Sequence, residues 1–404
     1  MGQNRIAAAL VACALQVPAA GWAQHGQVTL AQAVEGAWAR ALDAAESLGQ
    51  RRRADAAVQA AQAPWAAAPS LQVGQWRDRN AQASGRETEL GITLPLWLPG
   101  QRAARLDAAT SEREFALGAV DAGRLKVAGQ VREAQGNYYL QLAQLASAEA
   151  QQRTLVELAR DVERRVVAGD LARTDALVAS AEQLAARANV LAARQGVAAA
   201  LSQWRALTGL EQIAQPEPAT STMGERVPED HPALKATGIA VQLAQRRLDA
   251  ASASRREPPE LTVGARHEMA AGGGGRSRGI GVSLRLPFAT RDRNQPLIAD
   301  ALSELELAQA RESRLRAELA SEFEIARAGL KAGRLGVADE ESRSRLLRER
   351  YDLLERSYRA GNTALSDLLR ALTAATQADG ELLRKKAALS LAHARVQQAL
   401  GVLP

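Results

Sequence analysis

The sequence predicts a mainly α-helical protein with a smaller β portion, built from two internal repeats. The repeat is visible in a glycine and a following aspartate, because Gly169 and Asp175 recur 192 residues later as Gly361 and Asp367. Long stretches rich in Ala, Leu, Arg, Gln and Glu place apolar residues at helical spacing, and aromatic residues make up only 3% of the chain. A repeat of this length is too long for a solenoid unit, so it indicates that one structural half was duplicated.

Residues 1–23 are typical of an export signal. A charged residue, Arg5, precedes a short apolar run, and Gly21-Trp22-Ala23 provides a small-x-small cleavage site. A second interpretation is a lipobox over 10–13, which would make Cys13 a lipid-modified N-terminus. Both interpretations predict an exported chain without disulfides, because Cys13 is the only cysteine.

The first repeat is predicted to cover 24–210. Its expected elements are, in order, a helix over 29–62, a β-hairpin over 70–97, a long helix over 101–167 and a helix over 174–207. Thr29 and Thr174 are the predicted caps of the first and last of these helices. The long helix would extend about 100 Å at a rise of about 1.5 Å per residue. Gly169 breaks the chain between the last two helices.

A proline-rich stretch over 211–232 is the predicted linker between the repeats. The second repeat, 233–404, follows the same scheme. Its expected elements are a helix over 233–254, a β-hairpin over 260–288, a long helix over 294–358, a break at Gly361 and a helix over 364–400.

Each predicted strand has an apolar and a polar face. Leu90, Ile92 and Leu94, for example, alternate with polar residues and glycine. A tilted strand needs about 9–11 residues to cross a bilayer, and each predicted strand has about this length. No segment after the export signal offers the roughly 18 consecutive apolar residues that a membrane helix requires. Four strands cannot close a membrane barrel, which predicts that identical chains complete it. The alternative is two soluble hairpins packed on the helices, although Arg266 and Arg285 on the polar face favour a water-filled lumen.

The order of elements, the duplication and two segments resemble the TolC family of outer-membrane channels. The segments are 94–102, at the strand-to-helix junction, and 358–367, at the turn between the last two helices. The resemblance implies a homotrimer with a twelve-stranded β-barrel in outer-membrane lipid and a long antiparallel α-helical barrel in the periplasm. It also implies that a periplasmic membrane-fusion adaptor and an inner-membrane resistance-nodulation-division pump are partners.

The resemblance further implies a channel entrance at the two helix turns, with Gly169 and Gly361 at the tips. Asp367 matches the acidic position that rings the entrance, and Asp175 matches a residue that holds it closed. Tyr358 matches a closing partner of Asp175. The sequence departs from the family where Arg370 replaces a second acidic residue and where Thr363 replaces a basic one. Both aspartates also favour the positive end of a helix dipole, which alone would account for their positions.

Other classes of function find little support in the sequence. There is no phosphate-binding glycine loop and no nucleophile motif, so we expect no enzyme, catalytic residue or cofactor. His25, His231, His267 and His393 are scattered, which predicts surface or loop positions and no metal site. Arginines alternate with acidic residues along the helices, which indicates solvated helix faces rather than a nucleic-acid partner, despite a net charge of +6.

The expected function is therefore a passive exit duct of a tripartite efflux pump, with heavy-metal cations among the expected substrates. Two alternatives remain open from the sequence. One is the outer-membrane duct of a type I secretion system. The other is a soluble periplasmic coiled-coil protein with a structural or adaptor role.

Overall fold

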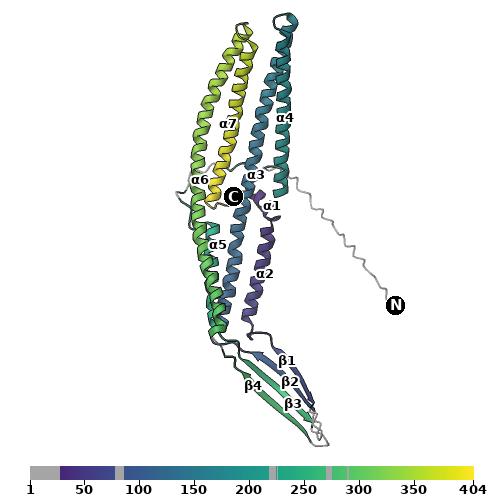
Figure 1. Cartoon of the computed structure of the whole chain (residues 1–404), viewed down its shortest axis with the longest axis vertical. Coiled ribbons are helices and arrows are strands. Elements are labelled where there is room, and N and C mark those ends of the chain that lie inside the picture. The colour runs from purple at the N-terminus through teal and green to yellow at the C-terminus, as the bar shows by residue number, and fades with distance from the viewer. Residues whose placement is uncertain (1–27, 78–85, 218–223, 225, 270–274, 289–290) are drawn as a thin grey trace, which may run out of the picture.

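The computed structural model describes residues 28–77, 86–217, 224, 226–269, 275–288 and 291–404. The predicted export signal, Cys13, His25 and residues 270–274 lie outside these ranges. Figure 1 shows a long, narrow bundle of helices that carries a four-stranded sheet at one end. The turns that join α3 (Gln101–Ala168) to α4 (Arg173–Thr208) and α6 (Arg291–Arg359) to α7 (Leu365–Ala399) lie at the opposite end of the bundle.

One helix of the first repeat, α3, runs along most of the bundle (Figure 1). The helices of this repeat are α1 (Leu30–Trp38), α2 (Leu42–Gln62), α3 (Gln101–Ala168) and α4 (Arg173–Thr208). Thr29 caps α1 as predicted, since its hydroxyl accepts the Gln32 N–H at 3.2 Å. The predicted Thr174 cap is wrong, because α4 begins after Ala172 and makes no side-chain cap bond. Thr174 therefore lies inside the first turn.

The prediction of a single helix over 29–62 is also wrong, because the chain turns between α1 and α2. The apolar side of α1, including Trp38, is buried in a core cluster halfway along the molecule with Trp204. The next helix, α2, packs along α3 and is mostly exposed. Helical periodicity continues through this turn because alanine suits both helices, so the sequence carries no sign of the break.

The second repeat consists of α5 (Pro232–Ala253), α6 (Arg291–Arg359) and α7 (Leu365–Ala399). The long helices of the two repeats have nearly equal lengths, 68 residues in α3 and 69 in α6. Each long helix packs along the shorter helix that follows it. The two repeats therefore form similar antiparallel pairs that lie side by side (Figure 1).

The two predicted hairpins are confirmed and together form one antiparallel sheet. Its strands are β1 (Ser70–Arg77), β2 (Arg86–Pro95), β3 (Glu260–Met269) and β4 (Arg276–Arg285), in that order. Strands β2 and β3 pair over ten residue pairs, from Arg86 opposite Met269 to Pro95 opposite Glu260. The central pair thus joins the two repeats, and β1 and β4 form the edges of the described sheet.

The middle of the molecule holds a buried arginine that the sequence placed on a solvated helix face. Arg132 of α3 is 2% exposed and donates hydrogen bonds to Glu217 at 3.1 Å, to Gln398 at 2.7 Å and to the Val402 carbonyl at 3.0 Å. A buried guanidinium needs such partners, because an unpaired charge in a protein interior is costly. Arg132 therefore ties residues after α4 and the C-terminal segment to α3.

No helix within the described ranges has an apolar stretch long enough to cross a membrane.

Candidate channel site

The two turns at the far end of the bundle end their long helices in the same way. Gly169 and Gly361 adopt φ angles of 85° and 80°, in the left-handed region that favours glycine. The following N–H groups of Asp170 and Asn362 return to carbonyls near the helix ends, at 2.9 and 3.0 Å. These bonds satisfy carbonyls that the helix leaves free, as in a Schellman cap. Left-handed glycines at both tips agree with the positions at which the sequence predicted helix breaks.

Tyr358 is the buried side chain that joins the two repeats at this end. It is 3% exposed and lies in a core cluster with Val162 and Leu368. The guanidinium of Arg165 stacks over its ring at 4.8 Å, and Asp161 holds the same guanidinium at 2.9 Å. A cation over an aromatic face is an attractive arrangement, especially where water is excluded. Sequence reasoning missed Arg165, because nothing local distinguishes it from the neighbouring surface arginines.

The Tyr358 hydroxyl is buried without a hydrogen-bond partner among the described residues. Burial raises the pKa of Tyr358 above its usual value, Arg165 lowers it, and Asp161 and Asp175 raise it further. Asp175 is half-buried in the first turn of α4 and is therefore near enough to act on the tyrosine electrostatically. The predicted pair Asp175–Tyr358 is thus brought to one place, although no direct hydrogen bond joins it within this chain.

Asp367 lies in the first turn of α7, where the helix dipole favours a carboxylate. Its side chain is 50% exposed and forms an ion pair with Arg370 at 2.7 Å. Because both groups are exposed to solvent, the pair itself contributes little to stability. It nevertheless places a positive charge directly beside Asp367.

The other end of the molecule carries two chemically distinct sheet faces. One face, which we call the outward face, exposes eight large apolar side chains: Leu71, Val73, Leu90, Ile92, Val263, Ile280, Val282 and Leu284. A contiguous exposed apolar surface of this kind marks a contact with membrane or protein. The opposite, inward face carries polar side chains and a row of glycines, Gly91, Gly264 and Gly281.

Charges on the inward face are largely arranged in cross-strand pairs. Arg266 pairs with Glu87, and Arg285 pairs with Glu260 at 3.3 Å. Glu89 and Glu268 also lie on this face and form no ion pair within the described part of the chain. The inward face therefore has a surplus of negative charge. Arg266 and Arg285 lie on the polar face, as the alternation predicted.

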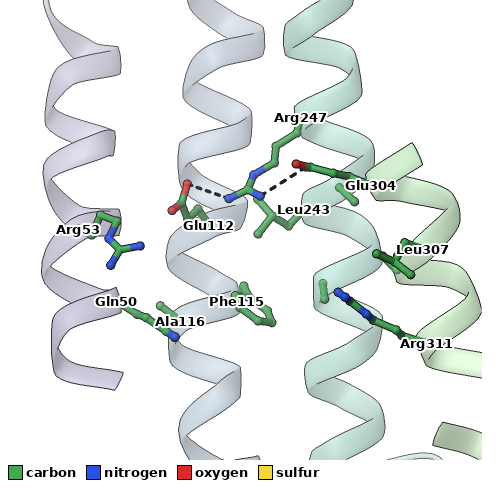
Figure 2. A pocket seen from close by; sticks show the side chains of 13 residues that line it. Gln50, Arg53, Glu112, Phe115, Ala116, Leu243, Arg247, Glu304, Leu307 and Arg311 are labelled. Atoms are coloured by element: carbon green, nitrogen blue, oxygen red, sulfur yellow. Dashed lines mark ion pairs between the residues drawn. The ribbon is translucent and has the colours of Figure 1, made fainter. Parts of the chain in front are cut away.

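A groove between α2, α3, α5 and α6 also holds charged side chains (Figure 2). Arg247 of α5 lies between Glu112 of α3 at 3.6 Å and Glu304 of α6 at 3.7 Å. The arginine connects three helices by ion pairs, and Arg53 and Arg311 line the same groove. These contacts pair Arg247, Glu112 and Glu304 with one another.

His231 lies in the loop before α5, in agreement with the expected surface or loop positions of the histidines, but it is buried rather than at the surface. This residue is 2% exposed and caps α5, since its Nδ1 accepts the Ala233 N–H at 3.2 Å. Burial lowers the pKa of His231, while Asp230 opposes this shift. A neutral imidazole is needed here because a protonated Nδ1 could not accept the capping bond. Among the described residues, no three His, Cys, Asp or Glu side chains are grouped as metal ligands would be.

Comparisons with protein-family profiles and with curated protein sequences give no match. Comparison with solved structures gives matches over almost the whole chain. The outer membrane protein VceC of Vibrio cholerae matches with a TM-score of 0.71 and 17% identity, over 92% of this chain and 96% of that one. The CmeC outer membrane channel of Campylobacter jejuni matches with a TM-score of 0.74 and 15% identity, over 99% and 94% of the two chains. For the MtrE outer membrane channel of Neisseria gonorrhoeae the TM-score is 0.70 and the identity 18%, over 92% and 88%.

The chain has the fold of the TolC-type outer-membrane channels. The resemblance predicted from the sequence is thus confirmed at the level of the fold. The TolC fold comprises the whole length of the described chain, from the strand sheet to the helix turns. Residues Gly169, Gly361, Asp175, Tyr358 and Asp367 all lie at the end of this fold that is farthest from the sheet.

Proposed function

We propose that this protein is the outer-membrane exit duct of a tripartite efflux pump, a passive channel rather than an enzyme. Three copies would close a twelve-stranded barrel in the outer membrane, and their helices would form a tunnel in the periplasm. A membrane-fusion adaptor and an inner-membrane pump of the resistance-nodulation-division class would deliver substrates to the tunnel. The structural similarity to the outer membrane channels CmeC and MtrE supports this assignment.

The observation that carries the proposal is the four-stranded sheet with one apolar face and two unpaired edges. Open strand edges are not tolerated in hydrocarbon, because each free N–H and C=O group there costs free energy. β1 and β4 form the edges of the described sheet. Pairing β1 of one copy with β4 of the next would satisfy both edges and would turn every apolar face outward to lipid.

The mass of the protein in mild detergent tests the assembly. We expect the mass of three chains, with the detergent bound around the sheet end. Substituting the outward residues Val73 and Val282 with Asp should prevent membrane insertion, whereas Gly49→Asp on the exposed side of α2 should not. A mature protein that is extracted with the soluble periplasmic fraction would overturn the proposal in favour of a coiled-coil adaptor.

We further propose that the helix turns form the periplasmic mouth, with Asp367 lining it and with Asp175 and Tyr358 holding it closed. A ring of carboxylates in a narrow mouth raises the local cation concentration. The ion pair between Asp367 and Arg370 would reduce this effect. The buried, unpartnered hydroxyl of Tyr358 supports a closing role, since a rotation of Asp175 or a neighbouring copy could supply its acceptor.

Planar-bilayer recordings test the mouth. Asp367→Asn should lower conductance at low salt and weaken block by multivalent cations, and Arg370→Ala should strengthen that block. Asp175→Ala and Tyr358→Phe should raise the leak of the closed channel. Glu163→Gln, on an exposed position of α3 near the same end, is the matched control. If all four variants conduct and block like the parent, the mouth assignment is wrong although the duct assignment stands.

For the cargo we propose cations, including heavy-metal cations. Support comes from the unpaired Glu89 and Glu268 on the inward face and from Asp367 at the other end. The reversal potential in a salt gradient tests this preference. The double variant Glu89→Gln with Glu268→Gln should shift selectivity toward anions, and deletion of the gene should sensitise cells to heavy-metal salts. Unchanged metal tolerance would remove heavy metals from the cargo and leave the duct intact.

A further inference from the structure

Four arginines gather at the loop end of the outward sheet face, beside the connections from β1 to β2 and from β3 to β4. Figure 1 shows that this end of the sheet lies away from the helices. The strand register places them in two neighbouring rows across the sheet. The outer row reads Arg77, Arg86, Met269 and Arg276, and the inner row reads Gln75, Thr88, His267 and Arg278. We call Arg77, Arg86, Arg276 and Arg278 the arginine belt.

The belt directly follows the apolar rows on the same face. The row next to it reads Val73, Leu90, Ala265 and Ile280. Successive rows on one face are about 7 Å apart, since each strand residue rises about 3.4 Å and side chains alternate. The apolar surface therefore changes to a polar one within one row, where Arg278 is the first basic side chain, and the other three arginines follow in the next row. This order of apolar, polar and charged side chains matches the change from hydrocarbon to headgroups in a bilayer.

Within the described part of the sheet, no carboxylate balances the charge of the belt. All four arginines are exposed, and none forms an ion pair within the described residues. No acidic side chain occupies this face in either row. Arg77 and Arg86 even lie directly opposite each other, an arrangement of like charges that destabilises a sheet.

The two sheet arginines on the inward face provide a contrast. Arg266 and Arg285 each have a glutamate partner on the neighbouring strand. The sheet thus balances its inward arginines with carboxylates and leaves its outward arginines without them. An external anion is the partner that such an arrangement requires.

We propose that the arginine belt binds the phosphate groups of phosphorylated glycolipid headgroups in the outer leaflet. This inference rests on the proposed function, because it requires the sheet to cross the membrane with its loop end outward. Arginine suits the role, since its planar guanidinium forms paired hydrogen bonds with phosphate oxygens. A lipid is favoured over a soluble anion because the belt is continuous with the apolar rows, which would hold the acyl chains.

The test compares lipid binding by the parent with that of a variant in which all four belt arginines are replaced by Gln. Purified protein is inserted into phosphatidylcholine vesicles that contain a phosphorylated glycolipid or the same lipid with its phosphates removed, and bound lipid is measured by native mass spectrometry. The parent should prefer the phosphorylated lipid. The Gln variant should bind it about tenfold or more weakly, as expected for the loss of one charge-assisted contact.

Two controls complete the experiment. Arg51→Gln with Arg52→Gln removes exposed charge from α2 and should leave the preference unchanged. A variant with Lys at the four belt positions should bind the phosphorylated glycolipid more tightly than the Gln variant does. Excess inorganic phosphate should compete only weakly with the glycolipid for the parent protein. Equal binding of the two lipids by the parent, or full competition by free phosphate, would overturn the inference. A parent that forms no trimer and carries no current in phosphatidylcholine alone would instead overturn the proposed function.

Discussion

The α3–α4 and α6–α7 turns can be compared position by position, because a constant offset of 192 residues relates them. Their backbones agree closely. Both turns pass through a left-handed glycine, and both following helices begin after an extended alanine, Ala172 or Ala364, with ψ angles of 150° and 149°. An aspartate occupies the third helical position in each case.

The side chains around this common backbone differ. Four polar residues of the second turn correspond to apolar residues of the first: Tyr358 to Val166, Arg359 to Val167, Thr363 to Leu171 and Arg370 to Val178. One position is reversed, since Leu365 corresponds to Arg173. The two repeats therefore share the glycine and the aspartate of the turn, and they differ in the polarity of the side chains around them.

The largest difference between the turns should be in the unfolding free energy that is lost when Tyr358 or its counterpart Val166 is replaced by alanine. Tyr358→Ala removes a buried ring and its contact with Arg165, and we expect a loss of about 3–5 kcal/mol of unfolding free energy. Val166→Ala removes a half-buried side chain and should cost about 1 kcal/mol. Chemical unfolding in detergent measures both. Equal losses would mean that Tyr358 does not join the repeats as its packing indicates.

If the two turns have equivalent backbones, replacing Gly169 or Gly361 with alanine should cost the same amount of stability. Gly169→Ala and Gly361→Ala each force a left-handed conformation on alanine, at a cost of about 1–2 kcal/mol. Gly329→Ala, inside α6 and with open space around the new methyl group, should instead stabilise the protein by about 0.5–1 kcal/mol. Thermal unfolding of the three variants gives the comparison. A cost at only one turn would show that the other can rearrange.

A smaller difference, in the dependence of stability on pH, is expected between the N-terminal ends of α5 and α2. His231 caps α5, whereas Ala41, 190 residues earlier, begins α2 without a side-chain cap bond. Because burial lowers the pKa of His231, the unfolded chain takes up the proton first. Stability is therefore complete above the unfolded value of about 6.5 and falls as pH drops toward the lower folded pKa.

His231→Asn keeps a capping acceptor and removes this titration. The variant should lose less thermal stability than the parent between pH 7 and pH 5. His393, whose pKa is also lowered by burial and by Arg334, is present in both proteins and cancels. Identical pH profiles for parent and variant would assign the acid sensitivity elsewhere.

The smallest effect on stability should come from exchanging the residues three positions after each aspartate. Arg370→Ala removes an exposed ion pair, and Val178→Arg offers Asp175 a similar one, so each should change the unfolding free energy by less than about 1 kcal/mol. The changes should fade further as salt is raised. A large loss in Val178→Arg would reveal that Val178 packs against another copy.

Local signals in the sequence gave correct predictions wherever the structure depends on neighbouring residues. The glycine breaks, the Thr29 cap and the alternation of both hairpins are examples, since left-handed backbone, capping hydroxyls and strand pleats act over a few residues. The aspartates at the two turns were found for the same reason, because their spacing from each glycine repeats.

Contacts between distant segments could not be predicted in this way. The pairing of β2 with β3 joins residues about 170 positions apart, and nothing in either strand specifies the other. Arg165 over Tyr358 and the buried Arg132 are charged residues on helices that look solvated until a distant segment covers them. The turn between α1 and α2 likewise follows directly after Trp38, which is buried in the same core cluster as the distant Trp204.

The sequence by itself determined the repeat, the helices, the strands and the residues that shape the two turns, because periodicity and backbone preference are local properties. Only the tertiary structure decided which strands are neighbours, which arginines are buried and which remain without partners. The physical reason is that the burial and charge balance of a side chain depend on the residues that contact it in the folded protein, and these can be far away in the sequence. The arginine belt appears only when the strand register sets four distant arginines on one face.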